Sequence, residues 1–226
     1  MKTTSLTLIF VGVAAIGHAA EGPFPDGIEG HETLGATGKA EWVTESPTGQ
    51  FSIVATCPSE FTGSGKYKVC DAGLLTVLHF RDKSKPDATL AVQTPDTVFG
   101  QSRYFFSPDD HWIIRSQHLG AGANDLTLYS IAADGKVGRI AINKAVFDCA
   151  FAGSRCRQNK YGHMQIEFMS WDPGLDLVHL NADATPLNAA ACPEIEKEVV
   201  YDLKQHKATR ASNSGKTDNG KNMLRR

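Results

Sequence analysis

Alternating hydrophobic and polar positions recur along most of the chain and predict a protein built mainly of β-strands. β-Branched and aromatic residues, which favour strands, gather in the same short runs, and Gly, Pro, Asn, Asp and Ser separate those runs. The predicted strands cover residues 41–44, 51–56, 66–69, 74–80, 89–94, 102–106, 111–118, 125–131, 136–142, 164–171, 175–181 and 196–203.

Two segments also show helical spacing. In residues 195–203 the apolar positions fit one face of a helix as well as they fit alternation, but the hairpin-like residues 201–210 favour a strand. Residues 143–151 (NKAVFDCAF) predict one short helix, with Asn143 as its N-terminal cap. The predicted fold class is therefore mainly all-β, with a single short helix.

Residues 104–131 (YFFSPDDHWIIRSQHLGAGANDLTLYSI) carry the clearest pattern, which is strand, turn, strand, loop, strand. Pro108 fixes the backbone for the second position of a turn, and the two aspartates after it favour turn geometry. This stretch resembles one blade of the WD40-like β-propeller repeats of bacterial periplasmic proteins. The resemblance covers about 28 residues and implies an architecture without naming a reaction.

A weak internal repeat extends this pattern along the chain. Similar units begin near Pro47, Pro108 and Pro173, which stand 61 and 65 residues apart. A standard WD40 repeat has about 40–45 residues, and three blades are too few for a closed ring of about 4–8. The resemblance implies instead an antiparallel β-meander of propeller-like blades, either partial or completed by a homodimer.

Composition divides the chain into four parts. Residues 1–19 have the Lys2, apolar run and small-residue cleavage site of a secretory signal peptide, which predicts a periplasmic or secreted protein. Residues 20–40 are rich in Gly, Pro and acids and predict an irregular N-terminal arm. Residues 41–210 predict a single β domain of three weak repeats, and residues 211–226 a disordered basic tail.

Charge is distributed unevenly over these parts. Residues 21–203 hold 15 Lys and Arg against 24 Asp and Glu, a net charge of −9, whereas residues 204–226 hold seven against one, a net charge of +6. An acidic body of this kind repels phosphates and argues against nucleic acid as a partner. No segment after the leader is long and apolar enough to predict a membrane span.

The five cysteines all follow the leader, and an oxidising compartment favours disulfides between near neighbours. Cys57 and Cys70 flank a Gly/Ser-rich loop, and Cys149 and Cys156 enclose a short one, so these two pairs are the predicted disulfides. Cys192 is then left over. Other pairings stay open, because spacing alone does not fix the connectivity.

No motif predicts a catalytic residue. The stretch closest to a serine nucleophile motif, residues 62–65 (TGSG), lacks the flanking strand and helix, and Cys192 has no His nearby in the sequence. No cofactor is predicted, and calcium stays an open alternative, because oxygen ligands in loops suit it. Those ligands would be Asp109, Asp110, Asn124 and Asp125, if the turn and the loop meet. The spacing of a calcium loop is absent, however, and turn formation explains the two adjacent aspartates equally well.

Exposed loops are the best place to look for function in a β scaffold. The Gly-rich loop after the central strand places His118, Asn124 and Asp125 where a partner would dock, and these are the predicted binding residues. We expect an exported, non-enzymatic β module that binds another macromolecule, as an inhibitor or immunity protein does. The alternatives are a small secreted hydrolase whose catalytic residues meet only in space, and a domain that binds the cell wall or another polysaccharide.

Overall fold

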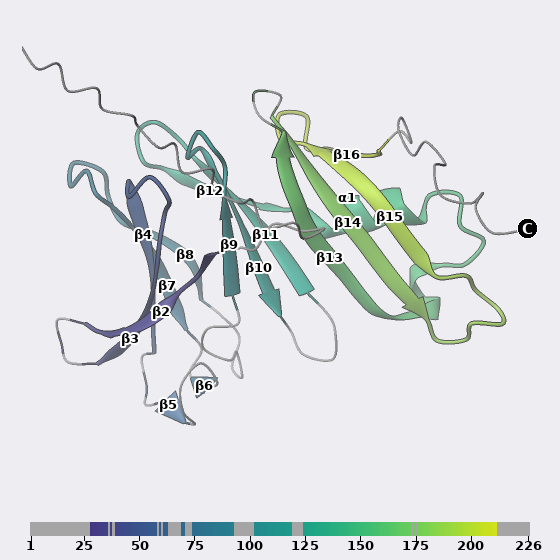
Figure 1. The fold of residues 1–226 in the computed structure, drawn as a ribbon, viewed down its shortest axis with the longest axis horizontal. Helices are drawn as coiled ribbons and strands as arrows, with labels where there is room; N and C mark the ends of the chain where they lie inside the picture. The colour runs from purple at the N-terminus through teal and green to yellow at the C-terminus, as the bar shows by residue number, and fades with distance from the viewer. Residues whose placement is uncertain are drawn as a thin grey trace, which may run out of the picture.

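Three antiparallel sheets follow one another along the chain and lie side by side along the long axis of the molecule (Figure 1). The computed structural model describes residues 28–211, except 36, 38, 58, 60, 63–68, 71–73, 93–101, 119–123, 173 and 175. The predicted leader, and all of the predicted basic tail except Ala211, lie outside the described residues. The predicted fold class is confirmed: the described residues are mainly β, with antiparallel sheets and one α-helix among them.

We name the three sheets the first, central and last sheet. The first sheet has the order β2 (His31–Leu34), β3 (Ala40–Glu45), β4 (Phe51–Thr56), β7 (Leu75–Phe80), β8 (Ala88–Val92). The central sheet has the order β1 (Ile28–Glu29), β9 (Ser102–Phe106), β10 (Trp112–His118), β11 (Asn124–Ile131), β12 (Val137–Ala141). The last sheet has the order β13 (Tyr161–Asp172), β14 (Leu177–Pro186), β15 (Ile195–Asp202), β16 (Lys207–Arg210). A two-stranded ribbon pairs β5 (Phe61–Thr62) with β6 (Val69–Cys70), and the helices are α1 (Asn143–Phe151) and the 3-10 turn η2 (Gln158–Lys160).

One face of the central sheet packs against the first sheet. Their shared apolar cluster includes Leu78 of the first sheet with Ile113 and Tyr129 of the central sheet. Phe51 and Phe106 join the two sheets near their turns, with ring centroids 5.4 Å apart. Strict alternation along β4 and β7 buries every second side chain, as a half-buried strand requires, and Phe51, Ile53, Leu78 and Phe80 enter this cluster.

The opposite face of the central sheet packs against α1 and the last sheet. Ile114 and Leu128 of the central sheet share an apolar cluster with Val146 of α1 and Val199 of β15. The adjacent residues Ile113 and Ile114 enter different clusters because successive side chains of a strand point to opposite faces. The central sheet is therefore the layer on which the other two assemble.

The turn between β9 and β10 has the geometry that its sequence predicts. Asp110 N donates to Ser107 O (3.0 Å), and Trp112 N donates to Ser107 Oγ (2.9 Å). Asp110 has a φ of 58°, a left-handed conformation that Asp tolerates better than most residues. The turn therefore depends on the serine hydroxyl and the second aspartate.

The turn between β3 and β4 is built in the same way. Gly49 N donates to Ser46 O (2.9 Å), and Phe51 N donates to Ser46 Oγ (3.3 Å). Gly49 takes the left-handed position, with a φ of 67°. The two turns contact each other, because Thr48 Oγ1 donates to Asp110 Oδ2. Two Ser-Pro segments 61 residues apart in the chain thus adopt one geometry and lie side by side.

Helix α1 has the predicted bounds but not the predicted cap. Its N-cap is Ile142, without a side-chain capping bond, and Asn143 Nδ2 instead donates to Asp125 Oδ1. At the other end, Arg210 of β16 donates to three backbone carbonyls, those of Cys149, Ala150 and Ala152. A cation is favourable there because the helix dipole leaves the last carbonyls partly negative.

The predicted irregular arm over residues 20–40 is wrong for the part that the structure describes. β1 pairs with β9, and β2 pairs with β3, so residues 28–34 add edge strands to two sheets. Gly30 and Gly35 interrupt this stretch, and each strand is too short for alternation to show in the sequence. Residues 195–202, where helix and strand were both compatible with the sequence, form the predicted strand.

One predicted disulfide is confirmed and the other is wrong. Cys57 and Cys70 are bonded, with their Cα atoms 5.7 Å apart. Cys156 is bonded to Cys192 rather than to Cys149, whose thiol is free. The free thiol thus belongs to Cys149 on α1, and Cys192, which the predicted pairing left without a partner, forms a disulfide.

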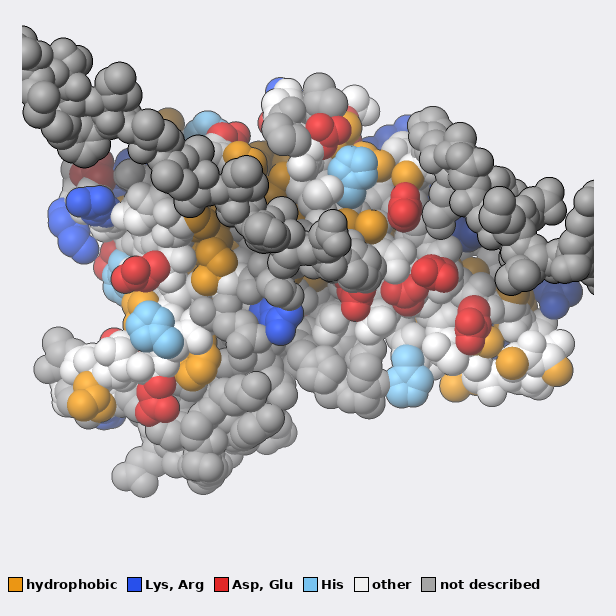
Figure 2. Space-filling model, viewed as in Figure 1, with side chains coloured by type: hydrophobic (Ala, Val, Ile, Leu, Met, Phe, Trp, Pro, Cys, Tyr) orange, Lys and Arg blue, Asp and Glu red, His pale blue; other side chains and the backbone are white. Residues whose placement is uncertain are grey.

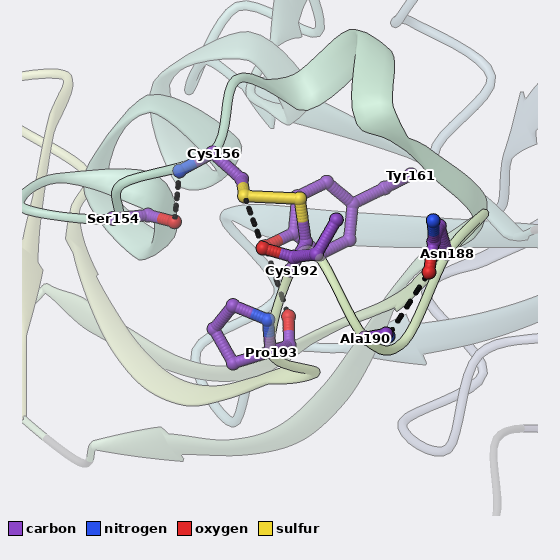
Figure 3. The surroundings of a disulfide bond; sticks show 8 residues. Ser154, Cys156, Tyr161, Asn188, Ala190, Cys192 and Pro193 are labelled. Carbon is purple, nitrogen blue, oxygen red and sulfur yellow. Dashed lines mark hydrogen bonds between the residues drawn. A yellow bond between two sulfur atoms is a disulfide. The ribbon is translucent and has the colours of Figure 1, made fainter.

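The pairing of β13 with β14 explains the Cys156–Cys192 bond (Figure 3). Tyr161 at the start of β13 lies opposite Pro186 at the end of β14, so the segments that flank this hairpin meet. Tyr161 Oη also donates to Pro193 O (2.9 Å), which holds the segment after β14 against the start of β13. Two disulfides suit a protein that folds in an oxidising compartment.

Candidate functional site

The two groups of polar residues suggested as calcium ligands lie at opposite ends of β10. Asp109 and Asp110 precede its first residue, whereas its last residue, His118, pairs with Asn124 at the start of β11. The seven residues of β10 separate these ends by about 23 Å at ~3.3 Å per residue. Neither aspartate of the turn therefore meets Asn124 or Asp125, so these four residues do not form the calcium site that was suggested for them.

The loop end of the central sheet carries four adjacent polar side chains. Ser102 of β9, Gln117 of β10 and Asp125 of β11 lie side by side in register. Asn143 of α1 extends this series through its hydrogen bond to Asp125. All four side chains are buried or half-buried, and we call them the polar row.

The structure places the three predicted binding residues differently. Asp125 belongs to the polar row. Asn124 is half-buried one position closer to the loop, so its side chain points to the opposite face of the sheet. The side chain of His118 lies outside the described residues. One of the three predictions therefore coincides with the polar row.

Arg115 lies two residues before Gln117 on β10, on the same face of the sheet as the polar row. It is buried, with 5% of its surface exposed. Its Nε and Nη2 atoms donate to Ser102 Oγ (3.1 and 3.0 Å), and Nη2 also donates to Gln117 Oε1 (2.5 Å). Both acceptors are neutral. Among the described residues Arg115 forms no ion pair, so no carboxylate there compensates its charge.

Two buried tyrosines flank Arg115. Tyr104 lies opposite it on β9, and Tyr129 lies diagonally across on β11. Burial raises the pKa of both phenols, and the Arg115 charge opposes part of that rise. Both hydroxyls therefore stay protonated at neutral pH. Tyr129 Oη is buried without a well-formed hydrogen bond to any described residue.

Arg115 is not among the binding residues predicted from the sequence, because it simply begins the polar second half of the strand WIIRSQH. A signal was nonetheless present. Alternation puts residue 115 on the same face as Ile113, and a charged residue at a position that pattern assigns to the core is typical of a functional site. Ser102 and Gln117 carried no such signal, because their role depends on which strands pair.

The outer face of the last sheet is acidic (Figure 2). Asp183 of β14 lies opposite Glu196 of β15 and diagonal to Glu167 of β13. Burial raises the pKa of Asp183, and the negative charges of Glu167 and Glu196 raise it further, against a hydrogen bond from Gln165. Among the residues that the structure describes, no three His, Cys, Asp or Glu side chains are grouped to hold a metal ion.

Replacing Asp183 by Asn is expected to raise the melting temperature at neutral pH. Because the pKa of Asp183 is raised, the folded state disfavours the ionised carboxylate. That penalty is present above the folded-state pKa and disappears below the unfolded pKa of about 3.9. Asn at this position keeps an acceptor for Asn181 Nδ2, which now lies 2.9 Å from Asp183 Oδ2. Thermal melts across this pH range should show the difference between variant and parent narrowing toward acid, and a constant difference would contradict the assignment.

None of the three cysteines outside the Cys57–Cys70 bond has the properties of a nucleophile. Cys192 is oxidised in its bond to Cys156. Cys149 keeps a half-buried thiol whose pKa is raised by burial, an effect that the Arg210 charge opposes. A raised pKa lowers the thiolate fraction and with it the reactivity. The TGSG stretch lies largely outside the described residues, Ser64 included.

Comparison of the chain with protein-family models, with curated proteins and with solved structures finds no match in any of the three. In the described part of the chain, no helix has the length and apolar character needed to cross a membrane.

Proposed function

We propose that this protein is an exported, non-enzymatic β module that binds another macromolecule at the loop end of its central sheet. The observation that carries the proposal is the polar row with Arg115 buried behind it. The sheet contributes apolar side chains to a core cluster on each of its faces, and polar groups buried beside such a core are unfavourable unless they are satisfied. Natural proteins keep polar groups buried beside an apolar core mainly where function requires them.

Three further observations support this proposal. The leader pattern of residues 1–19 and the two disulfides favour export. The matching geometry of the two Ser-Pro turns supports the interpretation of consecutive sheets as propeller-like blades. The net charge of −9 over residues 21–203 favours a protein or neutral glycan partner over nucleic acid.

The rival hypothesis of a small hydrolase has one observation in its favour. Asp183 has a raised pKa beside Glu167 and Glu196, and carboxyl groups with separated pKa values can supply an acid and a base. The two hypotheses differ for the variant Asp183→Asn. Hydrolysis on the acidic face would be lost, whereas binding at the polar row, on a different sheet, would be unchanged.

A photo-crosslinking amino acid at position 124 is expected to give a discrete covalent adduct when the protein is exported in its own host. The same amino acid at position 207 is the matched control. Asn124 lies at the loop end of the central sheet, whereas Lys207 is exposed on the far edge strand of the last sheet. Mass spectrometry of the adduct distinguishes a protein partner from a cell-wall glycan. Equal adducts from both positions would refute the location, and no adduct from either would refute binding.

A further inference from the structure

Four carboxylates gather in two neighbouring rows of side chains on the outer face of the last sheet (Figure 2). One row holds Gln165, Asp183 and Glu196, and the other holds Glu167, Asn181 and Glu198. The rows lie about 7 Å apart, because every second residue of a strand points to the same side at ~3.4 Å per residue. Ala182, which separates Asn181 from Asp183 on β14, is buried in the core cluster. The two rows therefore point away from the core.

The carboxylates of these rows repel one another. Burial raises the pKa of Asp183, and the negative charges of Glu167 and Glu196 raise it further. Neither row includes a Lys or an Arg. A cation held close to this face would offset the repulsion and stabilise the folded protein.

The chain leaves the last sheet at the end of the second row. Ala211 N donates to Glu198 O (3.1 Å), so the chain passes out of β16 beside Glu198. Because β15 and β16 are antiparallel, the direction of β16 leads from Glu198 toward Glu196. The residues that follow, 212–226 (SNSGKTDNGKNMLRR), hold four Lys and Arg against one Asp, a net side-chain charge of +3. The end of the chain thus carries the charge that complements this face.

The first cation of this segment is close enough to reach across the acidic face. Lys216 is five residues beyond Ala211, and five extended residues span about 17 Å. β13 is three strands from β16 in the sheet order, a distance of about 14 Å. Lys221, Arg225 and Arg226 follow further along the segment. A tether as short as this keeps the cations near the face at an effective concentration of about millimolar.

We propose that the acidic outer face of the last sheet is a docking surface, and that its occupant is the basic C-terminal segment of the same chain, residues 212–226. The contact is electrostatic, since it places ammonium and guanidinium groups beside carboxylates that otherwise repel one another. The same segment of a second copy has the same charge, but the tether favours the segment of the same chain. This surface is separate from the loop end of the central sheet, so it goes beyond the proposed function and does not depend on it.

Zero-length crosslinking with a carbodiimide tests the contact in the mature, full-length protein, because this reagent joins a Lys amine only to a carboxylate that touches it. Peptide mapping of the monomer fraction is expected to recover Lys216 or Lys221 joined to carboxylates of the two rows. The yield should fall at least about fivefold between about 0.01 M and about 1 M sodium chloride, since the Debye length shortens from about 30 Å to about 3 Å.

Asp202 is the matched control carboxylate. It lies on the same face as Glu198 and opposite Lys207, four residues before Ala211, so Lys216 is able to reach it as easily as it reaches β13. Equal crosslinking to Asp202 and to the two rows would mean that the tether alone brings the groups together, and would overturn the docking surface. Crosslinks found only in a dimer fraction would assign the occupant to a second copy, and the absence of crosslinks would refute the contact.

A thermodynamic cycle tests the position of the segment over Asp183 without a reagent. Asp183→Asn is expected to raise the melting temperature of the parent. The increase should be larger by about 1–2 °C when the four cations of residues 212–226 are replaced by Gln, because the segment then no longer offsets the charges around Asp183. Asn219→Gln combined with Asn222→Gln alters the segment without altering its charge, and should keep the increase seen in the parent. An equal increase in all three backgrounds would refute the contact.

Discussion

Removing the Cys156–Cys192 disulfide by replacing both cysteines with Ala is expected to lower the free energy of unfolding by about 4 kcal/mol on the chain-entropy model. The expected loss is large because the bond spans 36 residues of sequence. It also amounts to a large share of a typical stability of ~5–15 kcal/mol. Urea denaturation of parent and variant under non-reducing conditions measures the difference.

Cys149→Ala is the matched control for this experiment. It removes a thiol from the same region without removing a bond, and we expect a cost below about 1 kcal/mol. Peptide mapping without reduction should recover Cys156 linked to Cys192, and Cys149 alkylated. A peptide that links Cys149 to Cys156, or a large cost for Cys149→Ala, would instead favour the pairing predicted from spacing.

Local pattern was sufficient to predict most of the secondary structure. The strands at Phe51–Thr56 and Ser102–Phe106 and the helix at Asn143–Phe151 have the bounds that the residue pattern predicts. Each depends on contacts within a few residues or on one buried face, which periodicity reports directly. The turn at Ser107 was predictable for the same reason, since its hydrogen bonds lie within the turn.

Features that depend on which strands pair were not predictable in this way. Cys192 reaches Cys156 only because β13 pairs with β14. Arg115 meets Ser102 and Gln117 only because β9 is the neighbour of β10. The spacing of the cysteines favoured Cys149, the nearer one in the sequence, as the partner of Cys156. The alternation along β10 showed only that Arg115 lies on a buried face. The candidate site therefore depends on which strands pair and in which register. Local sequence pattern does not report that pairing, so it does not predict the site.

Truncating Leu128 to Ala is expected to lower the free energy of unfolding by about 2–5 kcal/mol, the range for a large-to-small change that leaves a cavity in a core. Leu128 is 0% exposed, lies opposite Ile114 in the β10–β11 pair, and belongs to the cluster between the central sheet, α1 and the last sheet. A cavity there loosens two sheets and the helix together. The melting temperature should fall by about 2–4 °C for each kcal/mol lost.

Leu34→Ala provides a control with the same chemical change. Leu34 is 74% exposed on the edge strand β2, so its loss should alter stability by less than about 0.5 kcal/mol. The comparison isolates burial, because both variants remove the same side-chain atoms from a β-strand. If Leu128→Ala melted within a degree or two of Leu34→Ala, the central and last sheets would not share a packed core. The central sheet would then not be the layer that organises the fold.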